Sequence, residues 1–150
     1  MRVVIGCDHA GVKLKEHLKK YLKNWGIEVE DMGTFEETPV DYPDIAFPLA
    51  KKVAGGDFDR GILICGTGIG MSIVANKVKG IRAAVCWDEY TAQVARTHND
   101  SNILCLGGRV LSFEEAERIL KIWIEENFQG GRHERRVRKI LEIERSRGDG

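Results

Sequence analysis

Residues 61–72 read GILICGTGIGMS, and the rest of the chain is best interpreted outward from this stretch. An apolar run ends in Cys65, three glycines follow within five residues, and a segment able to form a helix begins. A buried strand that ends in a glycine-rich turn is how an open α/β sheet presents reactive groups at its edge. We therefore interpret Cys65 as a reactive group and residues 66–70 as an anion-binding loop.

Apolar, β-branched runs alternate with amphipathic segments along the chain. This alternation is typical of a parallel sheet covered by helices on both faces. We predict an α/β fold: a three-layer αβα sandwich with a five-stranded, parallel, Rossmann-like sheet and a C-terminal helical arm. The first and third strands should be adjacent. The expected strands are residues 2–7, 27–31, 61–65, 81–86 and 103–106, and the expected helices begin near residues 12, 43, 69, 89, 113 and 132, with the third spanning 69–78.

Length and charge narrow the class of protein. A chain of 150 residues favours one domain, which we expect to span 1–150, with about 127–150 as the C-terminal arm. The formal net charge is zero, which argues against general attraction to nucleic acid or to an anionic membrane. No apolar stretch approaches the ~20 residues of a membrane span, and the first apolar run is too short for a secretory signal. We expect a cytoplasmic protein.

The four cysteines are Cys7, Cys65, Cys86 and Cys105, each in or at the end of a short apolar run. No CxxC pair and no cluster with metal-ligand spacing occurs, so we expect no metal. Three of the thiols are interpreted as buried and inert. Cys65 differs because glycine and polar neighbours follow it, and a helix that starts just downstream favours the thiolate form. It is a candidate base or nucleophile; a buried strand cysteine is the alternative.

The loop after Cys65 offers successive backbone N–H groups without obstructing side chains, which suits phosphate, carboxylate or a developing oxyanion. It departs from three known phosphate-binding patterns. Met71 stands where the dinucleotide fingerprint needs its third glycine and where a cysteine phosphatase loop needs arginine. The loop also lacks the lysine of a Walker motif. A tight packing turn is the alternative interpretation.

Other polar groups follow the expected strands and helices. Asp8 and His9 come directly after the first strand, and Arg109 follows the fifth strand after two glycines. We expect the first pair to lie beside the Cys65 loop, although an N-cap and a surface histidine would also explain it. His98 and Asn99 occupy a polar turn after a helix and are also candidate site residues. The alternative interpretation is that His98 is merely a cation at the C-terminus of that helix.

Arg132 and Arg136 are four residues apart and therefore share one face of the last helix. Guanidinium groups bind phosphate oxygens in pairs of hydrogen bonds. These two arginines are candidate phosphate ligands, with an ordinary charged helix face as the alternative.

Taken together, these motifs resemble the ribose-5-phosphate isomerase type B family, which includes galactose- and allose-phosphate isomerases. The resemblance runs in family order over about residues 1–145, and the combination is more specific than any one piece. The matching stretches are DHAG at 8–11, VDYPD at 40–44, CGTGIGMS at 65–72, RTHN at 96–99, GGR at 107–109 and GGRHERR at 130–136.

The resemblance implies reversible isomerisation of D-ribose 5-phosphate and D-ribulose 5-phosphate through an enediolate. Cys65 would be the base that moves a proton between C2 and C1, and His98 the acid that opens the furanose ring, assisted by Thr67 and Asp8. One branch of the family uses a glutamate after the loop, but residues 73–76 contain no acid, so this chain follows the cysteine branch. The expected substrate-binding residues are His9, Tyr42, Gly66, Gly68, Ile69, Gly70, Asn99, Arg109, Arg132 and Arg136.

The resemblance further implies a homodimer with an active site shared between the subunits, and two such dimers could pair into a tetramer. It also implies that no cofactor is needed. Within this set, the loop amides would hold the enediolate oxygen, and His9, Arg132 and Arg136 would bind the phosphate with Arg109 beside them. A six-carbon sugar-phosphate isomerase is the nearest alternative, and a non-catalytic nucleotide-binding module is a more distant one. We expect neither nucleic acid nor membrane as partner.

Overall fold

A computed structural model describes residues 1–148, with only the backbone of Gly148. The last two residues of the expected domain and arm lie outside the described part. All strand pairings are parallel, and the strand order is β2-β1-β3-β5-β4, so β1 and β3 are neighbours, as predicted. The strands are β1 (Arg2–Cys7), β2 (Glu28–Asp31), β3 (Arg60–Cys65), β4 (Ala83–Val85) and β5 (Ile103–Gly107).

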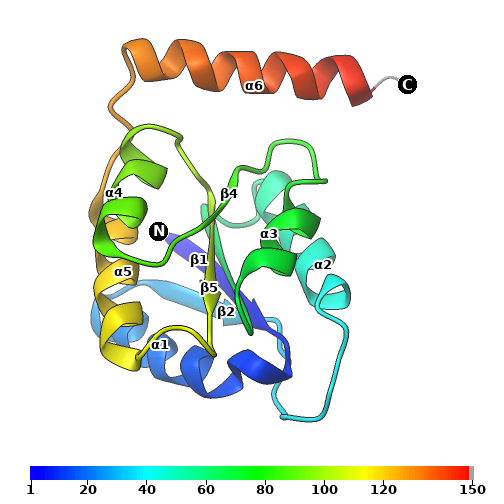
Figure 1. Ribbon diagram of the computed structural model, residues 1–150, viewed down its shortest axis with the longest axis vertical. Coiled ribbons are helices and arrows are strands. Elements are labelled where there is room, and N and C mark those ends of the chain that lie inside the picture. The colour runs from blue at the N-terminus through cyan, green and yellow to red at the C-terminus, as the bar shows by residue number, and fades with distance from the viewer. Residues whose placement is uncertain (149–150) are drawn as a thin grey trace.

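Helices cover both faces of the sheet and give the predicted three layers (Figure 1). One face carries α1, α4 and α5, and the other carries α2 and α3. The helices are α1 (Val12–Asn24), α2 (Pro43–Ala54), α3 (Ile69–Ala75), α4 (Glu89–Thr97), α5 (Phe113–Glu125) and α6 (Arg132–Gly148), and one turn of 3-10 helix covers His9–Gly11.

The core follows from the alternation of side chains along buried strands. In β3, Ile62 and Ile64 face the layer of α1, α4 and α5, whereas Leu63 and Cys65 face α2 and α3. Since both faces are covered, the strands read as continuous apolar runs, as parallel strands usually do. Cys65 is thereby aimed toward the side of the sheet where α3 begins.

Two elements are shorter than predicted by more than one residue, and Asn76 lies between them. Helix α3 ends at Ala75 instead of residue 78, β4 spans Ala83–Val85 instead of 81–86, and β2 begins one residue late, at Glu28. The Asn76 side chain donates to the Ala83 carbonyl at 3.0 Å and accepts from the Ala83 N–H at 2.8 Å. The Asn76 side chain thus pairs with the backbone at the free edge of β4, as a neighbouring strand would. The chain leaves the helix at this residue.

The arm is a single helix set apart from the three layers. Gly130 and Gly131 have positive φ angles of 69° and 57°, a conformation that favours glycine and ends the preceding segment. Helix α6 then crosses the end of the sheet opposite to the loop that joins β2 and α2 (Figure 1). No helix within residues 1–148 has the length and apolar character needed to cross a bilayer.

Candidate active site

The register of the sheet brings three strand ends together. Cys7 pairs with Ile64 and Cys65 pairs with Gly107, so the residues that follow β1, β3 and β5 meet at one edge. The Asp8 N–H donates to the Ile64 carbonyl at 3.0 Å, and the Gly108 N–H donates to the Cys65 carbonyl at 2.8 Å. Asp8 and the Cys65 loop are therefore neighbours, as the sequence predicts.

Cys65 lies at the mouth of this edge and is only 5% exposed. The Gly68 N–H donates to Cys65 Sγ at 3.1 Å. Gly68 has a φ of 84°, and this left-handed turn is what directs its N–H back to the sulfur. The loop that follows Cys65 thus holds its sulfur in place at the edge of the sheet.

The other three thiols are of a different kind. Burial raises the pKa of Cys7 and of Cys86 to about 12. Burial also raises the pKa of Cys105 well above its usual value, helped by the neighbouring Cys65 and Cys86. These three groups stay protonated at neutral pH, as expected for inert core thiols. All four cysteines are free.

The glycine loop already uses two of its amides internally. Besides Gly68, the Ile69 N–H donates to Thr67 Oγ1 at 3.2 Å. Thr67 is thus held at the start of α3, with its hydroxyl facing the loop. The Arg109 N–H donates to the Gly66 carbonyl at 3.0 Å, and the Arg109 guanidinium lies 3.4 Å from where a Cβ on Gly66 would stand. A cation is therefore packed directly against the loop.

Asp8 and His9 are held by backbone contacts on the same edge. Asp8 Oδ1 accepts from the Ala10 N–H at 2.9 Å, so Asp8 is also the N-cap that the alternative interpretation described. His9 Nδ1 accepts from the Val40 N–H at 3.2 Å. An imidazole that accepts at Nδ1 carries its proton on Nε2 when neutral, so Nε2 is available as a donor.

Tyr42 is the N-cap residue of α2, and its ring covers Gly70. A Cβ on Gly70 would stand 2.6 Å from Tyr42 Cζ, closer than real carbon atoms approach. Glycine at position 70 is thus what allows the aromatic ring to lie over the loop. Tyr42 is 39% exposed, so its other side is open to a ligand.

Lys15 is a buried charged residue that the sequence analysis did not single out. It is fully buried, and its Nζ donates to Asp31 Oδ1 at 2.8 Å and to the Thr34 carbonyl at 2.6 Å. Asp31 also accepts from Lys19 and from the Gly33 N–H. Burial acts to raise the pKa of Asp31, but the hydrogen bonds from both lysines outweigh it and hold that pKa below its usual value. A lysine between Leu14 and Leu18, on the apolar stripe of α1, was the available signal.

The remaining predicted residues lie at the opposite end of the sheet. Helix α4 runs back toward the amino end of β5, so His98 and Asn99 precede Ile103, whereas Cys65 pairs with Gly107 at the carboxyl end. At about 3.3 Å per strand residue, the two groups are on the order of 15 Å apart. Arg132 and Arg136 are on α6, at the same end as His98, whose ring stacks on His133 with centroids 4.0 Å apart.

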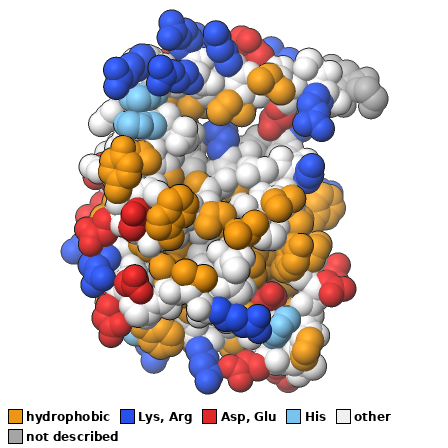
Figure 2. Space-filling model, viewed as in Figure 1, with side chains coloured by type: hydrophobic (Ala, Val, Ile, Leu, Met, Phe, Trp, Pro, Cys, Tyr) orange, Lys and Arg blue, Asp and Glu red, His pale blue; other side chains and the backbone are white. Residues whose placement is uncertain are grey.

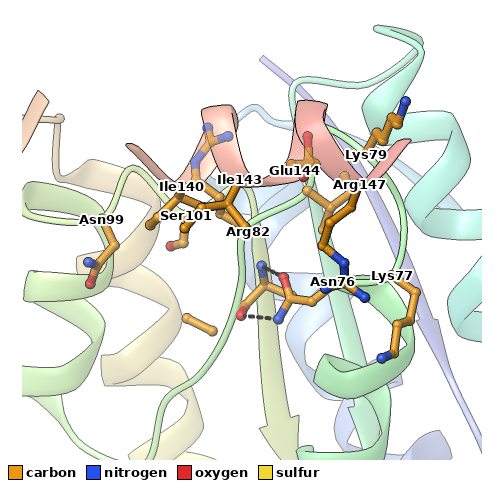
Figure 3. Close-up of a pocket in the computed structure, with 13 residues that line it drawn as sticks. Asn76, Lys77, Lys79, Arg82, Asn99, Ser101, Ile140, Ile143, Glu144 and Arg147 are labelled. Carbon is orange, nitrogen blue, oxygen red and sulfur yellow. Dashed lines mark hydrogen bonds between the residues drawn. The ribbon is translucent and has the colours of Figure 1, made fainter. Parts of the chain in front are cut away.

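A cavity of about 590 Å³ lies at this amino end, beneath α6, and not over Cys65 (Figure 3). Ile140 and Ile143 of α6 point into it, and Ala83 and Ala84 of β4 also line it. Glu144 holds α6 in place by accepting from the Gly80 N–H at 2.8 Å. The remaining lining residues are Asn76, Lys77, Lys79, Ile81, Arg82, Asn99, Ser101 and Arg147.

One chain therefore carries two separate groups of candidate residues, and neither group holds all of them: a thiol with a glycine loop lies at one end, and a histidine with two arginines lies at the other. Residues 3–140 match the family model for Ribose/Galactose Isomerase. The chain belongs to this family. The resemblance inferred from the motifs is confirmed.

Individual family members agree over nearly the whole chain. The chain is 48% identical to ribose-5-phosphate isomerase B of Escherichia coli K12 over 146 residues, which is 97% of this chain and 98% of that one. A structure of ribose-5-phosphate isomerase B from Clostridium thermocellum superposes with a TM-score of 0.97 at 51% identity, over 99% of this chain and 100% of that chain. The enzyme from Mycoplasma genitalium, solved with ribulose-5-phosphate bound, has a TM-score of 0.92 at 43% identity, over 96% of each chain.

Among residues 1–148, no group of three or more His, Cys, Asp or Glu side chains is arranged to hold a metal ion.

Proposed function

We propose that this family member interconverts D-ribose 5-phosphate and D-ribulose 5-phosphate, with Cys65 as the base. The observation that carries the proposal is the Cys65 thiol, which accepts a backbone N–H at 3.1 Å inside a glycine loop that borders Asp8 and Arg109. Proton abstraction next to a carbonyl needs a base and donors for the developing oxyanion, and these groups supply both. The named relatives support the choice of a five-carbon sugar phosphate.

The reaction begins with ring opening. The C1–O4 bond of the furanose breaks as His98 gives a proton to O4, and the O1–H proton passes to the Asp8 carboxylate, leaving an aldehyde at C1. Thr67 orients the hydroxyl groups during this step. Asn99 and Tyr42 hold the sugar chain from either side.

Isomerisation follows on the open chain. The Cys65 thiolate removes the C2 proton, and the electron pair moves onto O1 to give the enediolate, which the loop amides of residues 66–70 stabilise. A proton moves from O2 to O1, and the Cys65 thiol returns its proton to C1. The net change is one hydrogen from C2 to C1 and one from O2 to O1, so no cofactor is required.

The phosphate would be bound at the far end of the substrate by His9, Arg132 and Arg136, with Arg109 beside them. The His9 ring supports this role because its Nδ1 is occupied by the Val40 N–H, which leaves Nε2–H as a donor. A phosphate held away from the reacting carbons supplies orientation through binding energy.

These roles require a second copy of the chain, because His98 and the two arginines lie at the other end of the sheet from Cys65. We infer a two-fold symmetric homodimer, whose site takes Cys65 from one protomer and His98 from its partner. A two-fold axis across the strand direction reverses the partner's sheet, so the carboxyl end of one sheet meets the amino end of the other. Such a dimer has two equivalent sites, and each site combines the Cys65 group of one protomer with the His98 group of its partner.

The surface supports this arrangement. Large hydrophobic side chains gather across the middle of one face, over α3, β4 and the start of α4 (Figure 2). The side chains of Ile69 and Ile73 in α3, of Tyr90 in α4, and of Trp87 between β4 and α4 are each more than half exposed. A monomer seldom exposes such a patch, so a partner surface is expected there. The cavity beneath α6, with Ile140 and Ile143 on its wall, would receive part of the partner's α3.

Cytoplasmic location fits the free cysteines, because free thiols persist in reducing compartments. The six-carbon alternative remains within the same family. Turnover of ribose 5-phosphate should exceed that of allose 6-phosphate by kcat/KM; the reverse ranking would overturn the choice of sugar. Stabilisation by adenine nucleotides and not by pentose phosphates in a thermal-shift assay would favour the nucleotide-binding alternative.

The decisive test of the mechanism is exchange of the C2 proton of ribose 5-phosphate with solvent deuterium. Cys65→Ala should abolish the exchange, while substrate binding measured by calorimetry persists. Cys105→Ala is the matched control and should retain exchange, because its thiol is buried and protonated. Exchange that survives in Cys65→Ala would exclude Cys65 as the base.

The shared site is tested by mixing two inactive variants. Cys65→Ala and His98→Ala homodimers should each be inactive, and subunit exchange at equal amounts should restore about a quarter of wild-type activity, since half of the dimers are mixed and each has one intact site. If no activity returns although mixed dimers form, each site is built from a single chain.

A further inference from the structure

Asp100 follows His98 and Asn99 in the turn after α4, and its backbone conformation is unusual. Its φ is 50°, and among the described residues it is the only one with a side chain beyond hydrogen in that region. Glycine is the ordinary residue for a left-handed position at the end of a helix, because a Cβ is disfavoured there. An aspartate at this place therefore points to a use for its carboxylate.

Two arginines hold the Asp100 carboxylate and carbonyl. Arg96 Nη1 donates to Asp100 Oδ1 at 3.0 Å and to the Ser101 carbonyl at 2.6 Å. Arg82 Nε donates to the Asp100 carbonyl at 2.9 Å, and its Nη2 lies 3.4 Å from Asp100 Oδ2. The Arg96 and Arg82 side chains are only 8% and 18% exposed, so solvent screens these contacts weakly.

This cluster, which we call the Asp100 clamp (Arg82, Arg96 and Asp100), joins two elements to the turn. Arg82 comes directly before β4, and Arg96 belongs to α4. The turn that carries His98 and Asn99 is thus fixed to both the sheet and the helix. General acid catalysis needs its donor within hydrogen-bond reach of the accepting oxygen, so a fixed turn matters for His98.

The clamp also reaches the connector that precedes α6. Arg96 Nε donates to the Glu126 carbonyl at 3.4 Å, and the Gln129 N–H donates to the Thr97 carbonyl at 3.1 Å. The His98 ring then stacks on His133 at an angle of 11°. Burial lowers the pKa of His133, and the nearby Arg132 and Arg136 act in the same direction.

We propose that Arg82, Arg96 and Asp100 are positioning residues that hold His98 in place for opening the furanose ring of the substrate. They act through the His98 turn and do not touch the substrate. The inference rests on the proposed function, in which His98 is the ring-opening acid, and it makes a prediction that the proposed function alone does not.

The test compares two reactions of the same enzyme that differ in ring opening. Ribose 5-phosphate is a furanose and must be opened before isomerisation. Ribulose 5-phosphate is an open chain, because its C5 hydroxyl is esterified, and exchange of its C1 proton with solvent deuterium needs Cys65 but no ring opening. Damage to His98 positioning should slow the first reaction and spare the second.

Asp100→Gly is the sharpest variant, because glycine keeps the left-handed turn and removes only the carboxylate. We expect its turnover of ribose 5-phosphate to fall by about 100-fold, within the range of a lost general acid, while C1 exchange of ribulose 5-phosphate changes by less than about threefold. His98→Ala should show the same pattern. Arg96→Met should follow Asp100→Gly, and Asp100→Asn, which keeps an oxygen for Arg96, should lose less.

Arg118→Met is the matched control for loss of an arginine, because its ion pair with Glu89 is well exposed on both sides. It should match wild type in both reactions. Equal loss of both reactions in Asp100→Gly would overturn the proposal in favour of a general structural role, and wild-type turnover in Asp100→Gly and Arg96→Met would overturn it outright. If the glycine variant fails to fold, Arg96→Met decides by the same comparison. Failure of the proposed function would appear separately, as exchange that survives in Cys65→Ala.

Discussion

Gly70→Ala should impair the enzyme without destabilising it. Gly70 lies in the first turn of α3, where alanine is normally better than glycine by about 0.5–1 kcal/mol. The new Cβ would stand 2.6 Å from Tyr42 Cζ and 2.7 Å from Cε2, whereas ordinary contact begins near 3.4 Å. The ring must therefore move by roughly 0.8 Å, and it can do so cheaply because Tyr42 is 39% exposed.

The expected loss is that of one hydrogen bond between Tyr42 and the sugar. At about 0.5–1.5 kcal/mol, kcat/KM for ribose 5-phosphate should fall roughly 2- to 10-fold. The melting temperature should stay the same or rise slightly. Steady-state kinetics and thermal unfolding on the same preparation measure both quantities.

A double-mutant cycle isolates the cause. Tyr42→Leu removes the ring that the new methyl group would strike, so Gly70→Ala should have little further effect on kcat/KM in that background. The reasoning is refuted if Gly70→Ala leaves kcat/KM unchanged, or if its effect is as large in the Tyr42→Leu background as in the wild type.

Three further predictions concern the phosphate site and the buried lysine. Arg136→Ala should raise KM for ribose 5-phosphate about 10- to 100-fold with little change in kcat, as expected for the loss of a charged hydrogen bond to phosphate. Arg138→Ala, on the other face of α6, is the control and should leave KM unchanged. Equal effects of the two substitutions on KM would exclude Arg136 from the phosphate site. Lys15→Met removes the fully buried partner of Asp31, which keeps Lys19 and the Gly33 N–H, and should cost about 1.5–3 kcal/mol in denaturant unfolding. The exposed Lys13→Met should cost less than about 0.5 kcal/mol. Equal losses in the two variants would contradict the importance of the Lys15–Asp31 pair. Because the Asp31 pKa is lowered in the folded state, the stabilising contribution of this carboxylate should be present above the unfolded pKa near 3.8 and should disappear as the pH falls through the folded pKa. When unfolding is followed from pH 5 to 2, the free energy of unfolding should therefore fall less steeply in Asp31→Asn than in wild type. Identical slopes would contradict the lowered pKa of Asp31.

The sequence predicts the sheet well because each element signals itself locally. Five apolar runs with β-branched residues became five parallel strands, and Asp88 and Ser112 each form the capping hydrogen bonds that start α4 and α5. The adjacency of β1 and β3 also followed, since polar residues come after both strands. The predicted boundaries were wrong where a side chain forms the hydrogen bonds that a backbone group would otherwise form, as Asn76 does at the edge of β4.

Local sequence patterns did not predict the contacts between segments that are distant in the chain. The place of Lys15 on the apolar stripe of α1 signals burial, but its partner Asp31 is brought to it only by the approach of β2 and the loop after it. Asp100 looks like an ordinary turn residue, yet Arg82 and Arg96 close on it from two elements. Spacing along one segment carries no information about which other segment will pack against it.

The sequence by itself determined the candidate groups of this protein: a cysteine followed by a glycine loop, two polar strand ends, and paired arginines on the last helix. The tertiary structure decided where these groups stand. Parallel strands point the same way, so Cys65 and His9 gather at the carboxyl edge, while α4 must run back along the sheet and deliver His98 to the amino edge beside Arg132 and Arg136. The distance between the two edges is set by the length of the strands, and that is why one copy of the chain keeps the two groups of candidate residues apart.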